Sequence, residues 1–275
     1  MKLEAATLAL EPRSVGECID LAVLFYRRHA TKLLALSLLF GAIPVAAGVV
    51  LASSGTGWLW SGLAFVFVSP FLGAAVVAGA GHHVFGEEFT IRTALRHMRA
   101  RLGTLALLLP ASRIAYGAVS VMCWGLLTVP VATRYGFLSE VVILEQLKGY
   151  RIAKRCDEIL RDMYLEACVR YTAIVAFAFG VSLTLFILID LGSQVLFGIP
   201  VFAAKVSWAV AVDDILNLLA YDPLLVGALS ATWWLVYPLA RLAWFFCYLD
   251  ARVRKEGWDV EIALRVEARR LSHAY

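Results

Sequence analysis

The chain has 275 residues, of which 61% are hydrophobic and only 17% are charged. Soluble domains contain about half hydrophobic and about a quarter charged residues, so this composition excludes an ordinary soluble fold and indicates a membrane protein. The formal net charge is only +4, and we expect no nucleic-acid partner. The five cysteines show neither CxxC spacing nor histidine partners at zinc-like intervals, which favours free, buried thiols.

The N-terminal segment, residues 1–13, predicts that the first membrane span is retained. It contains Glu4 and Glu11, and it lacks the basic start, the apolar run and the small-residue cleavage site of a signal peptide. We therefore expect the first apolar block to be part of the folded protein.

That first block covers residues 33–86, which are 54 consecutive positions without Asp, Glu, Lys or Arg. A helix of this length would extend roughly 80 Å, whereas the hydrocarbon core of a bilayer is about 30 Å thick. Residues 53–57 give the strong turn signal inside the block, and each arm beside it is long enough to span. The block predicts a transmembrane hairpin.

Later charge-free runs cover residues 114–133, 171–189 and 224–240, and each is close to the length of one span. Most Lys and Arg residues fall between the apolar blocks, in residues 1–32, 87–101, 132–162 and 250–275. Residues 190–222 instead hold one Lys and four Asp. The positive-inside rule predicts a multi-pass protein of a bacterial cytoplasmic (inner) membrane, with both termini cytoplasmic and residues 190–222 outside.

Residues 102–147 are the difficult part of this topology. The basic segments before and after them favour the same side of the membrane, but the return leg contains Arg134 and Glu140. A short or re-entrant hairpin is one solution, and a single crossing that places the next basic segment outside is the other. The predicted fold is an all-α integral membrane protein with about six transmembrane helices, or with four and a re-entrant hairpin.

Three segments that precede the apolar blocks carry an apolar stripe at helical spacing beside basic residues. The stripes are Ile19, Val23, Tyr26 and Ala30; Ile91, Leu95, Met98 and Leu102; and Ile152, Cys156, Ile159 and Met163. Basic amphipathic helices of this kind lie in the membrane interface, although any amphipathic helix can show such spacing. They divide one membrane domain, residues 1–275, into three expected units: 14–86, 88–147 and 148–249, with an outer insertion at 190–222 and a cytoplasmic tail at 250–275.

Basic side chains on these segments and at the end of the last span are candidates for contact with anionic lipid head groups. A Lys or Arg held near an anionic membrane surface contributes on the order of 1 kcal/mol. The candidates are Arg27, Arg28, Arg92, Arg96, Arg99, Arg151, Lys154, Arg155, Arg252, Arg254 and Lys255.

A second group of charged residues falls near or within the apolar blocks and predicts a buried polar network. Its members are Arg113, Glu140, Glu145 and Arg241. Such groups are costly in a membrane unless they are paired or hydrated. Three interpretations stay open: a structural ion pair, a transport or ligand site, and side chains that extend to the interface. Arg170 lies within two turns of the inner boundary, and we expect it to reach the interface without a partner.

The pair His82-His83, followed by Glu87, suggests a metal site, but adjacent histidines on a helix point about 100° apart. Polar residues that mark the inner end of a span are the simpler interpretation. The chain has no HExxH, Walker A or GxSxG motif and no paired carboxylates in a catalytic loop. We therefore expect no catalytic residues, no metal and no cofactor, and we expect that the protein is not an enzyme.

The end of the last span resembles the C-terminal signature of bacterial integral membrane proteins of the glycerophosphoryl-diester-phosphodiesterase membrane-domain-like family. The matching residues are Cys247, Tyr248, Leu249, Asp250, Arg252, Arg254, Lys255, Glu256, Gly257 and Asp259. Weaker similarity covers Pro12, Ser14, Gly16, Glu17 and residues 26–28, and also Glu145, Gly149, Ala153 and Arg155. The resemblance implies a helical domain of about six spans and unknown role. It implies no phosphodiesterase activity, because this chain has no room for the soluble catalytic domain.

Two functions follow as hypotheses. The first is a non-enzymatic scaffold or accessory subunit of a membrane complex, which contacts anionic lipids and partner membrane proteins. The alternative is a small transporter or lipid-handling protein that uses the buried Arg/Glu network. A hydrated cavity lined by the four network residues would favour transport, whereas direct ion pairs in a closed bundle would favour the scaffold.

Overall fold

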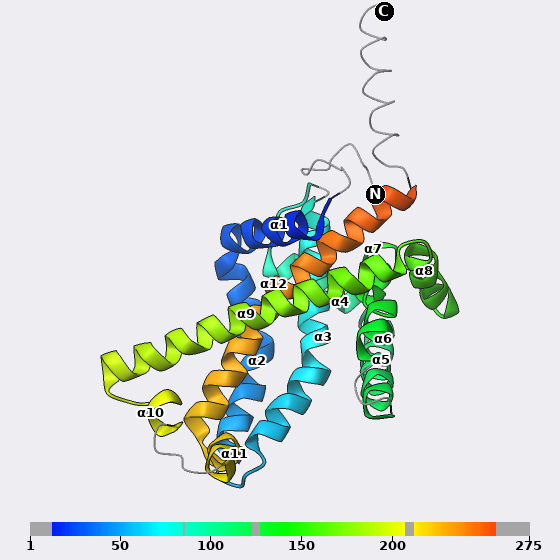
Figure 1. The fold of residues 1–275 in the computed structure, drawn as a ribbon. Helices are drawn as coiled ribbons and strands as arrows, with labels where there is room; N and C mark the ends of the chain where they lie inside the picture. The colour runs from blue at the N-terminus through cyan, green and yellow to red at the C-terminus, as the bar shows by residue number, and fades with distance from the viewer. Residues whose placement is uncertain (1–12, 85, 123–126, 207–211, 257–275) are drawn as a thin grey trace, which may run out of the picture. The chain divides into compact units, whose positions relative to one another are not determined.

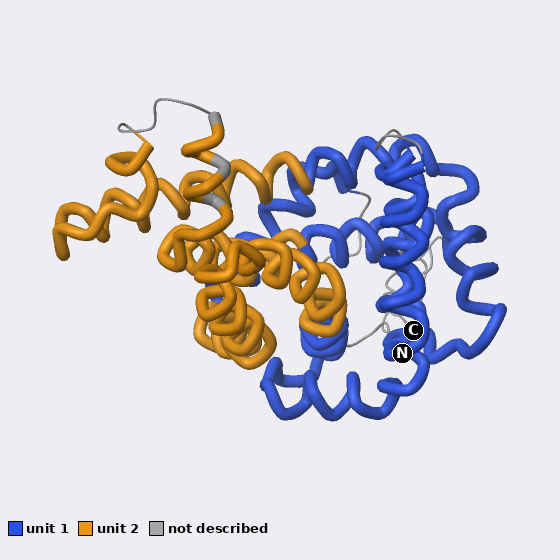
Figure 2. Tube along the Cα trace, turned by 90° about the horizontal axis from the view of Figure 1, so that it is seen from below, with its two compact units in different colours: residues 1–29, 74–174, 241–275 blue, residues 30–73, 175–240 orange. Residues whose placement is uncertain are grey.

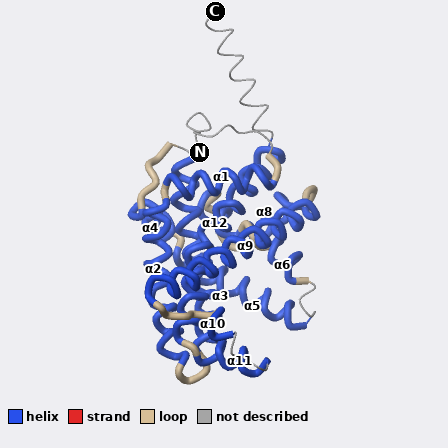
Figure 3. The backbone as a smooth tube through the Cα atoms, turned by 60° about the vertical axis from the view of Figure 1, so that its left-hand side comes forward, coloured by secondary structure: helices blue, strands red, loops and turns tan. Residues whose placement is uncertain are grey.

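The computed structural model describes residues 13–84, 86–122, 127–206 and 212–256, and these residues form helices without any strand (Figure 1). The predicted all-α class is confirmed. The helices are α1 (Val15–Arg28), α2 (Ala30–Ala52), α3 (Gly57–Val84), α4 (Ile91–Ala100), α5 (Leu102–Met122), α6 (Thr128–Arg134), α7 (Leu138–Leu144), α8 (Tyr150–Leu160), α9 (Tyr164–Phe197), α10 (Ala203–Val206), α11 (Val212–Tyr221) and α12 (Pro223–Glu256). Short loops join most of them (Figure 3).

Five of the described helices, α2, α3, α5, α9 and α12, are long and apolar enough to cross a membrane. Their surfaces agree with this assignment, since large apolar side chains are exposed on them. Ile43 on α2 is 78% exposed, Val121 on α5 is 82% exposed and Phe179 on α9 is 69% exposed. Apolar surface of this extent needs lipid or protein to cover it. The chain is a multi-pass membrane protein.

The first predicted hairpin is confirmed as α2 and α3, with its turn at residues 53–56. Gly55 has a φ of 74°, a conformation that glycine adopts without a steric penalty. The two helices pack closely, because a Cβ atom on Gly48 would lie only 1.8 Å from the Oγ of Ser61. A helix pair in a membrane gains its packing energy from such small residues.

Residues 102–147, the middle segment of the chain, begin and end close to each other. Arg101, just before α5, donates a hydrogen bond of 2.7 Å to the side chain of Gln146, which follows α7. The return leg is not one spanning helix but two short ones, α6 and α7, that pack beside α5. This arrangement agrees with the predicted short or re-entrant hairpin and does not agree with a single crossing.

The third pair of long helices, α9 and α12, encloses the predicted insertion, which contains α10 and α11. Asp190 accepts hydrogen bonds from the backbone N–H groups of Val201, Phe202 and Ala203, at 3.1, 2.8 and 3.0 Å. Lys205 binds Asp222 at the other end of the insertion. One carboxylate therefore fixes the start of the insertion, and an ion pair closes it.

The chain forms two compact units (Figure 2). Unit 1 contains residues 1–29, 74–174 and 241–275, and unit 2 contains residues 30–73 and 175–240. This division follows contacts and differs from the three consecutive units that the stripes predict, so the internal repeat stays a prediction. The tail that we expect from residue 257 onward lies outside the described residues.

Each unit has its own aromatic or apolar core. In unit 1, the rings of Phe137 and Trp244 stack at 4.7 Å between centroids, and Tyr171 meets Trp244 edge-on at 5.4 Å. In unit 2, Phe186, Val201 and Leu225 form a buried cluster. The unit 1 core brings α7, α9 and α12 together, and these helices carry most of the charged residues discussed below.

The amphipathic segments form α1, α4 and α8, and the predicted apolar stripe is most fully buried on α8. Ile152, Cys156 and Ile159 of α8 are all buried. On α1 the buried residues are Cys18 and Ala22, whereas Val23 of the predicted stripe is 40% exposed. The buried face of α1 is thus rotated by about one residue from the prediction, because α1 also packs against unit 1 residues such as Phe89 through Phe25.

Candidate functional site

A buried charged pair of unit 1 joins Glu140 of α7 to Arg241 of α12. The Glu140 side chain is fully buried and that of Arg241 is 11% exposed. The guanidinium of Arg241 also donates to the Oγ of Ser139 and, at 3.2 Å, to the carbonyl of Gly136. One carboxylate oxygen of Glu140, Oε1, has no hydrogen-bond partner among the described residues. The pair is direct and largely closed to water.

Packing of Gly136 explains how α7 comes so close to α12. A Cβ atom on Gly136 would lie 2.8 Å from the indole of Trp244, which is one helical turn after Arg241. A larger residue at position 136 would push the start of α7 away. The close approach therefore brings Ser139 and Glu140 within reach of the Arg241 guanidinium.

Glu145, at the end of α7, belongs to a second cluster. It accepts hydrogen bonds from Arg155 at 2.6 Å and from the hydroxyl of Tyr248 at 2.8 Å. Arg155 also binds Glu256, which in turn pairs with Arg252 at 2.6 Å. Burial opposes the charge of Arg155, but its bonds to Glu145 and Glu256 outweigh burial and raise its pKa.

A third cluster surrounds Asp250, whose side chain is 1% exposed. Arg170 of α9 binds Asp250 at 2.6 Å and Glu166 at 2.6 Å. Arg254 binds Asp250 at 3.1 Å. The prediction that Arg170 reaches the interface without a partner is wrong, because α12 brings a buried carboxylate to it. Asp250 was visible in the sequence only as part of the family-like signature.

The fourth predicted network residue, Arg113, does not join these pairs. Its guanidinium lies 5.3 Å from the ring centroid of Tyr116, a cation–π contact. No ion pair of Arg113 occurs in the described part of the chain, and its buried Nε has no hydrogen-bond partner there. The four residues therefore do not line one common site: two are paired with each other, one belongs to a separate cluster, and one lies against an aromatic ring.

The lipid-contact candidates divide into two groups. Arg155, Arg252, Arg254 and Lys255 bind carboxylates within unit 1. The others are exposed, and Lys154 among them lies 3.8 Å from Glu158. The exposed residues for which the described chain shows no ion pair are Arg27, Arg28, Arg92, Arg96, Arg99 and Arg151. The ends of α1, α4 and α8 thus present positive charge outward.

The histidine pair separates as its helical spacing predicts. His83 faces α1, with its ring 5.6 Å from that of Phe25. His82 stacks on His97 of α4, with centroids 3.6 Å apart, and its Nδ1 lies 3.4 Å from Glu87. Burial, followed by the neighbouring His82, lowers the pKa of His97. The contribution of His97 had no local signal in the sequence, because it comes from the next helix.

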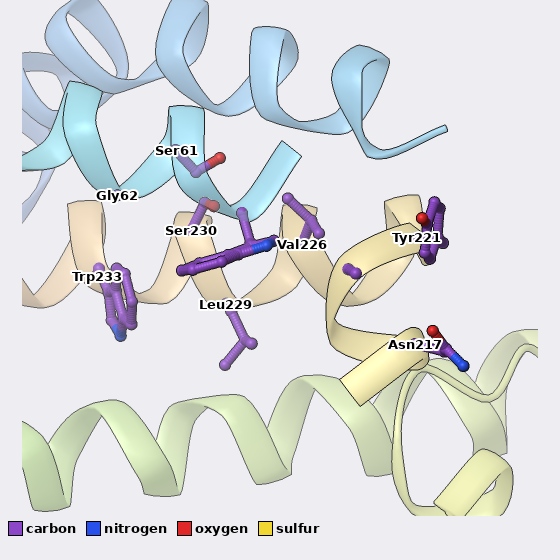
Figure 4. Close-up of a pocket in the computed structure, with 10 residues that line it drawn as sticks. Ser61, Gly62, Asn217, Tyr221, Val226, Leu229, Ser230 and Trp233 are labelled. Carbon is purple, nitrogen blue, oxygen red and sulfur yellow. The ribbon is translucent and has the colours of Figure 1, made fainter. Parts of the chain in front are cut away.

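An apolar pocket of about 740 Å³ lies in unit 2 (Figure 4). It is lined from α3 by Trp58, Ser61 and Gly62, from α11 by Asn217, Ala220 and Tyr221, and from α12 by Val226, Leu229, Ser230 and Trp233. Among the residues that the structure describes, none that lines this pocket is charged. Its volume falls within the usual range for small-ligand pockets, and its lining suits an apolar molecule such as an acyl chain.

The cysteines that the structure describes are free, as the sequence analysis predicts. Cys18, Cys156, Cys168 and Cys247 are free, and all but Cys168 are buried. Cys123 lies outside the described residues. Buried free thiols behave as small apolar groups, and they give the site no nucleophile that faces solvent.

Comparison of the chain with protein-family models, with curated proteins and with solved structures finds no match. The resemblance at residues 247–259 therefore stays a prediction. The geometry of the clusters and the exposed basic helices is what supports a proposal about function.

Proposed function

We propose that the protein is a non-enzymatic scaffold or accessory subunit of a membrane complex that holds anionic lipid head groups with α1, α4 and α8. One observation carries this proposal: the exposed arginines of these helices have no ion pair in the described chain, although carboxylates pair with most other basic residues of unit 1. Free positive charge beside membrane spans suits an anionic lipid surface.

The way in which α4 and α8 are held adds support. Their apolar residues pack into unit 1, with Ala94 and Met98 buried on α4 and Ile152 and Ile159 buried on α8. Each helix is therefore fixed in rotation about its own axis, and its basic residues keep one direction. A preorganised row of charges loses less conformational entropy when it binds a head group than a flexible tail would lose.

The closed charge clusters argue for a structural role of the buried residues. Arg241 binds Glu140 directly, and Glu145 is occupied by Arg155 and Tyr248. A transport site needs charged groups that can exchange a partner for a substrate or a proton. The charged groups of these clusters are already paired with one another. This pairing favours the scaffold over the alternative, a transporter that uses the same residues.

The lipid contact is tested in the intact protein, reconstituted in nanodiscs that contain phosphatidylglycerol and phosphatidylcholine. Native mass spectrometry counts the phosphatidylglycerol molecules that stay bound to the protein after it is released from the nanodisc. We expect the triple variant Arg92→Gln, Arg96→Gln, Arg99→Gln to retain severalfold fewer of them, because α4 then presents no positive charge. The matched control Arg92→Lys, Arg96→Lys, Arg99→Lys keeps the charge and should retain the wild-type number.

If the triple glutamine variant retains as many phosphatidylglycerol molecules as the wild type, the lipid part of the proposal is wrong. The partner part has its own test, in which the protein is extracted from native membranes with a lipid-preserving polymer. If neither a stoichiometric partner chain nor an enrichment in anionic lipid accompanies it, the scaffold function is wrong.

A further inference from the structure

Three side chains that commonly ligate metals meet at the corner between α3 and α4 in unit 1. They are His82 near the end of α3, Glu87 in the connecting turn and His97 on α4. One ligand atom from each lies within 4.8 Å of those from the other two. Lipid contact and the charge clusters described above involve none of these side chains.

The backbone of the turn places Glu87 beside His82. The N–H of Glu87 donates to the carbonyl of His82 at 3.0 Å, and the N–H of Gly86 donates to the carbonyl of His83 at 3.1 Å. These are the two hydrogen bonds of a Schellman motif, and Gly86 has the positive φ, 94°, that the motif needs. The turn therefore directs the chain back over the last turn of α3, where Glu87 reaches His82.

Close packing of α3 on α4 places His97 there as well. A Cβ atom on Gly79 would lie 3.1 Å from the Cβ of Ala94, so the two helices approach each other at this point. His82 follows Gly79 by three residues, and His97 follows Ala94 by three residues, so both lie on the same face one turn further along. The two imidazoles consequently stack, with 21° between their planes.

Distances between the ligand atoms fit a small coordination sphere. His82 Nδ1 lies 3.4 Å from one Glu87 oxygen, and His97 Nε2 lies 3.8 Å from the other. Ligands about 2.0 Å from a tetrahedral Zn²⁺ ion lie about 3.3 Å from one another. The Nε2 atom of His97 is buried and has no hydrogen-bond partner in the described chain, so one strong ligand atom is available.

We propose that His82, Glu87 and His97 form a binding site for a divalent transition-metal ion of the Zn²⁺ type, with a fourth position open to water or another ligand. Two imidazoles and one carboxylate suit Zn²⁺ and neighbouring transition metals and do not suit Mg²⁺ or Ca²⁺, which prefer oxygen ligands. Binding turns the stacked rings apart, because an ion lies in the plane of each imidazole that ligates it. The broad χ2 torsion of histidine permits this turn at low cost.

An ion at this place would clamp the last turn of α4 to the last turn of α3. The clamp does not depend on the proposed function, since it involves no lipid and no partner chain. It would fix the short helix that carries the exposed Arg92, Arg96 and Arg99.

The test uses the full-length protein with a tag that contains no histidine, stripped with EDTA and purified in detergent. Calorimetric titration with ZnCl₂ should show one ion bound per chain, and MgCl₂ should give no binding heat. CoCl₂ should produce the visible absorption bands of a site with tetrahedral geometry. We expect His82→Gln and His97→Gln each to weaken Zn²⁺ binding by at least tenfold, and Glu87→Gln to weaken it by about tenfold.

Glu88→Gln is the matched control, because it changes the neighbouring carboxylate, which is exposed and lies outside the proposed set of ligands. This variant should bind Zn²⁺ like the wild type. Far-UV circular dichroism verifies that each variant is folded, and Glu87→Gln, at an exposed position, keeps the test open if a histidine variant unfolds. Fewer than one ion per two chains, or equal affinity in wild type and the His82 and His97 variants, would overturn the site.

Discussion

Glu140 and Arg241 show what a buried ion pair contributes in this protein. Both charges are removed from solvent, and one oxygen of Glu140 lacks a hydrogen bond in the described chain. The cost of removing two charges from water can exceed their mutual attraction, so the pair need not add net stability. Loss of one partner should destabilise the protein, because the remaining charge is then buried without compensation.

We therefore expect Arg241→Leu alone to destabilise the protein by about 3–5 kcal/mol, and Arg241→Leu with Glu140→Leu to lie much closer to the wild type. Unfolding in mixed detergent micelles with increasing dodecyl sulfate, followed by far-UV circular dichroism, measures both. A double variant as unstable as the single one would show that the pair does more than compensate its own charges.

Helix α4 illustrates how a short helix depends on its neighbours. It has ten residues, and a capping box between Thr90 and Thr93 satisfies its first N–H groups. Helices of this length are marginal in isolation, so most of their stability comes from packing. The contact of Ala94 with Gly79 and the buried ring of Phe89 supply that packing for α4.

Gly79→Ala should accordingly destabilise the protein by about 1–3 kcal/mol, because the new methyl group would lie 2.3 Å from the Phe89 ring. The control is Gly103→Ala on α5, where a Cβ atom meets nothing within 4 Å. That change should be neutral or stabilise by up to about 1 kcal/mol, since alanine favours the helix. Thermal unfolding in the same detergent measures the stability of both variants. Equal melting temperatures would contradict the close packing at Gly79.

At the scale of the whole molecule, the path of residues 102–147 decides the topology. The hydrogen bond from Arg101 to Gln146 joins the two ends of this segment. The chain consequently enters α8 on the side from which it entered α5. The turn between α2 and α3 lies at the opposite end of the spanning helix α3 from the α3–α4 turn.

Single cysteines at Arg99, Lys148 and Ser54 test this path, in a background where Cys123 and Cys168 are replaced by alanine. We expect Arg99→Cys and Lys148→Cys to react with a membrane-impermeant maleimide from the same side, and Ser54→Cys from the other side. All three positions are exposed, and the remaining native thiols are buried. Labelling of positions 99 and 148 from opposite sides would mean that the segment crosses once.

The sequence by itself determined the membrane class and the hairpin of α2 and α3. These features are local, because a spanning helix needs about 20 consecutive apolar residues and a turn needs residues that permit it. The same local logic predicted the adjacent positions of His82 and His83 on different helix faces. The charge-free runs at 114–133, 171–189 and 224–240 did not give the limits of α5, α9 and α12, which begin or end outside those runs.

Only the tertiary structure decided which charged or ligating side chains meet. Arg170 binds Asp250, which lies 80 positions away in the sequence, and Arg241 binds Glu140, which lies 101 positions away. His82 stacks on His97 of the next helix. The contact of His82 with His97 depends on the close helix approach at Gly79, and that of Arg241 with Glu140 depends on the close approach of Gly136 to Trp244. A charged residue within an apolar segment indicates that a partner is needed, but the fold selects the partner.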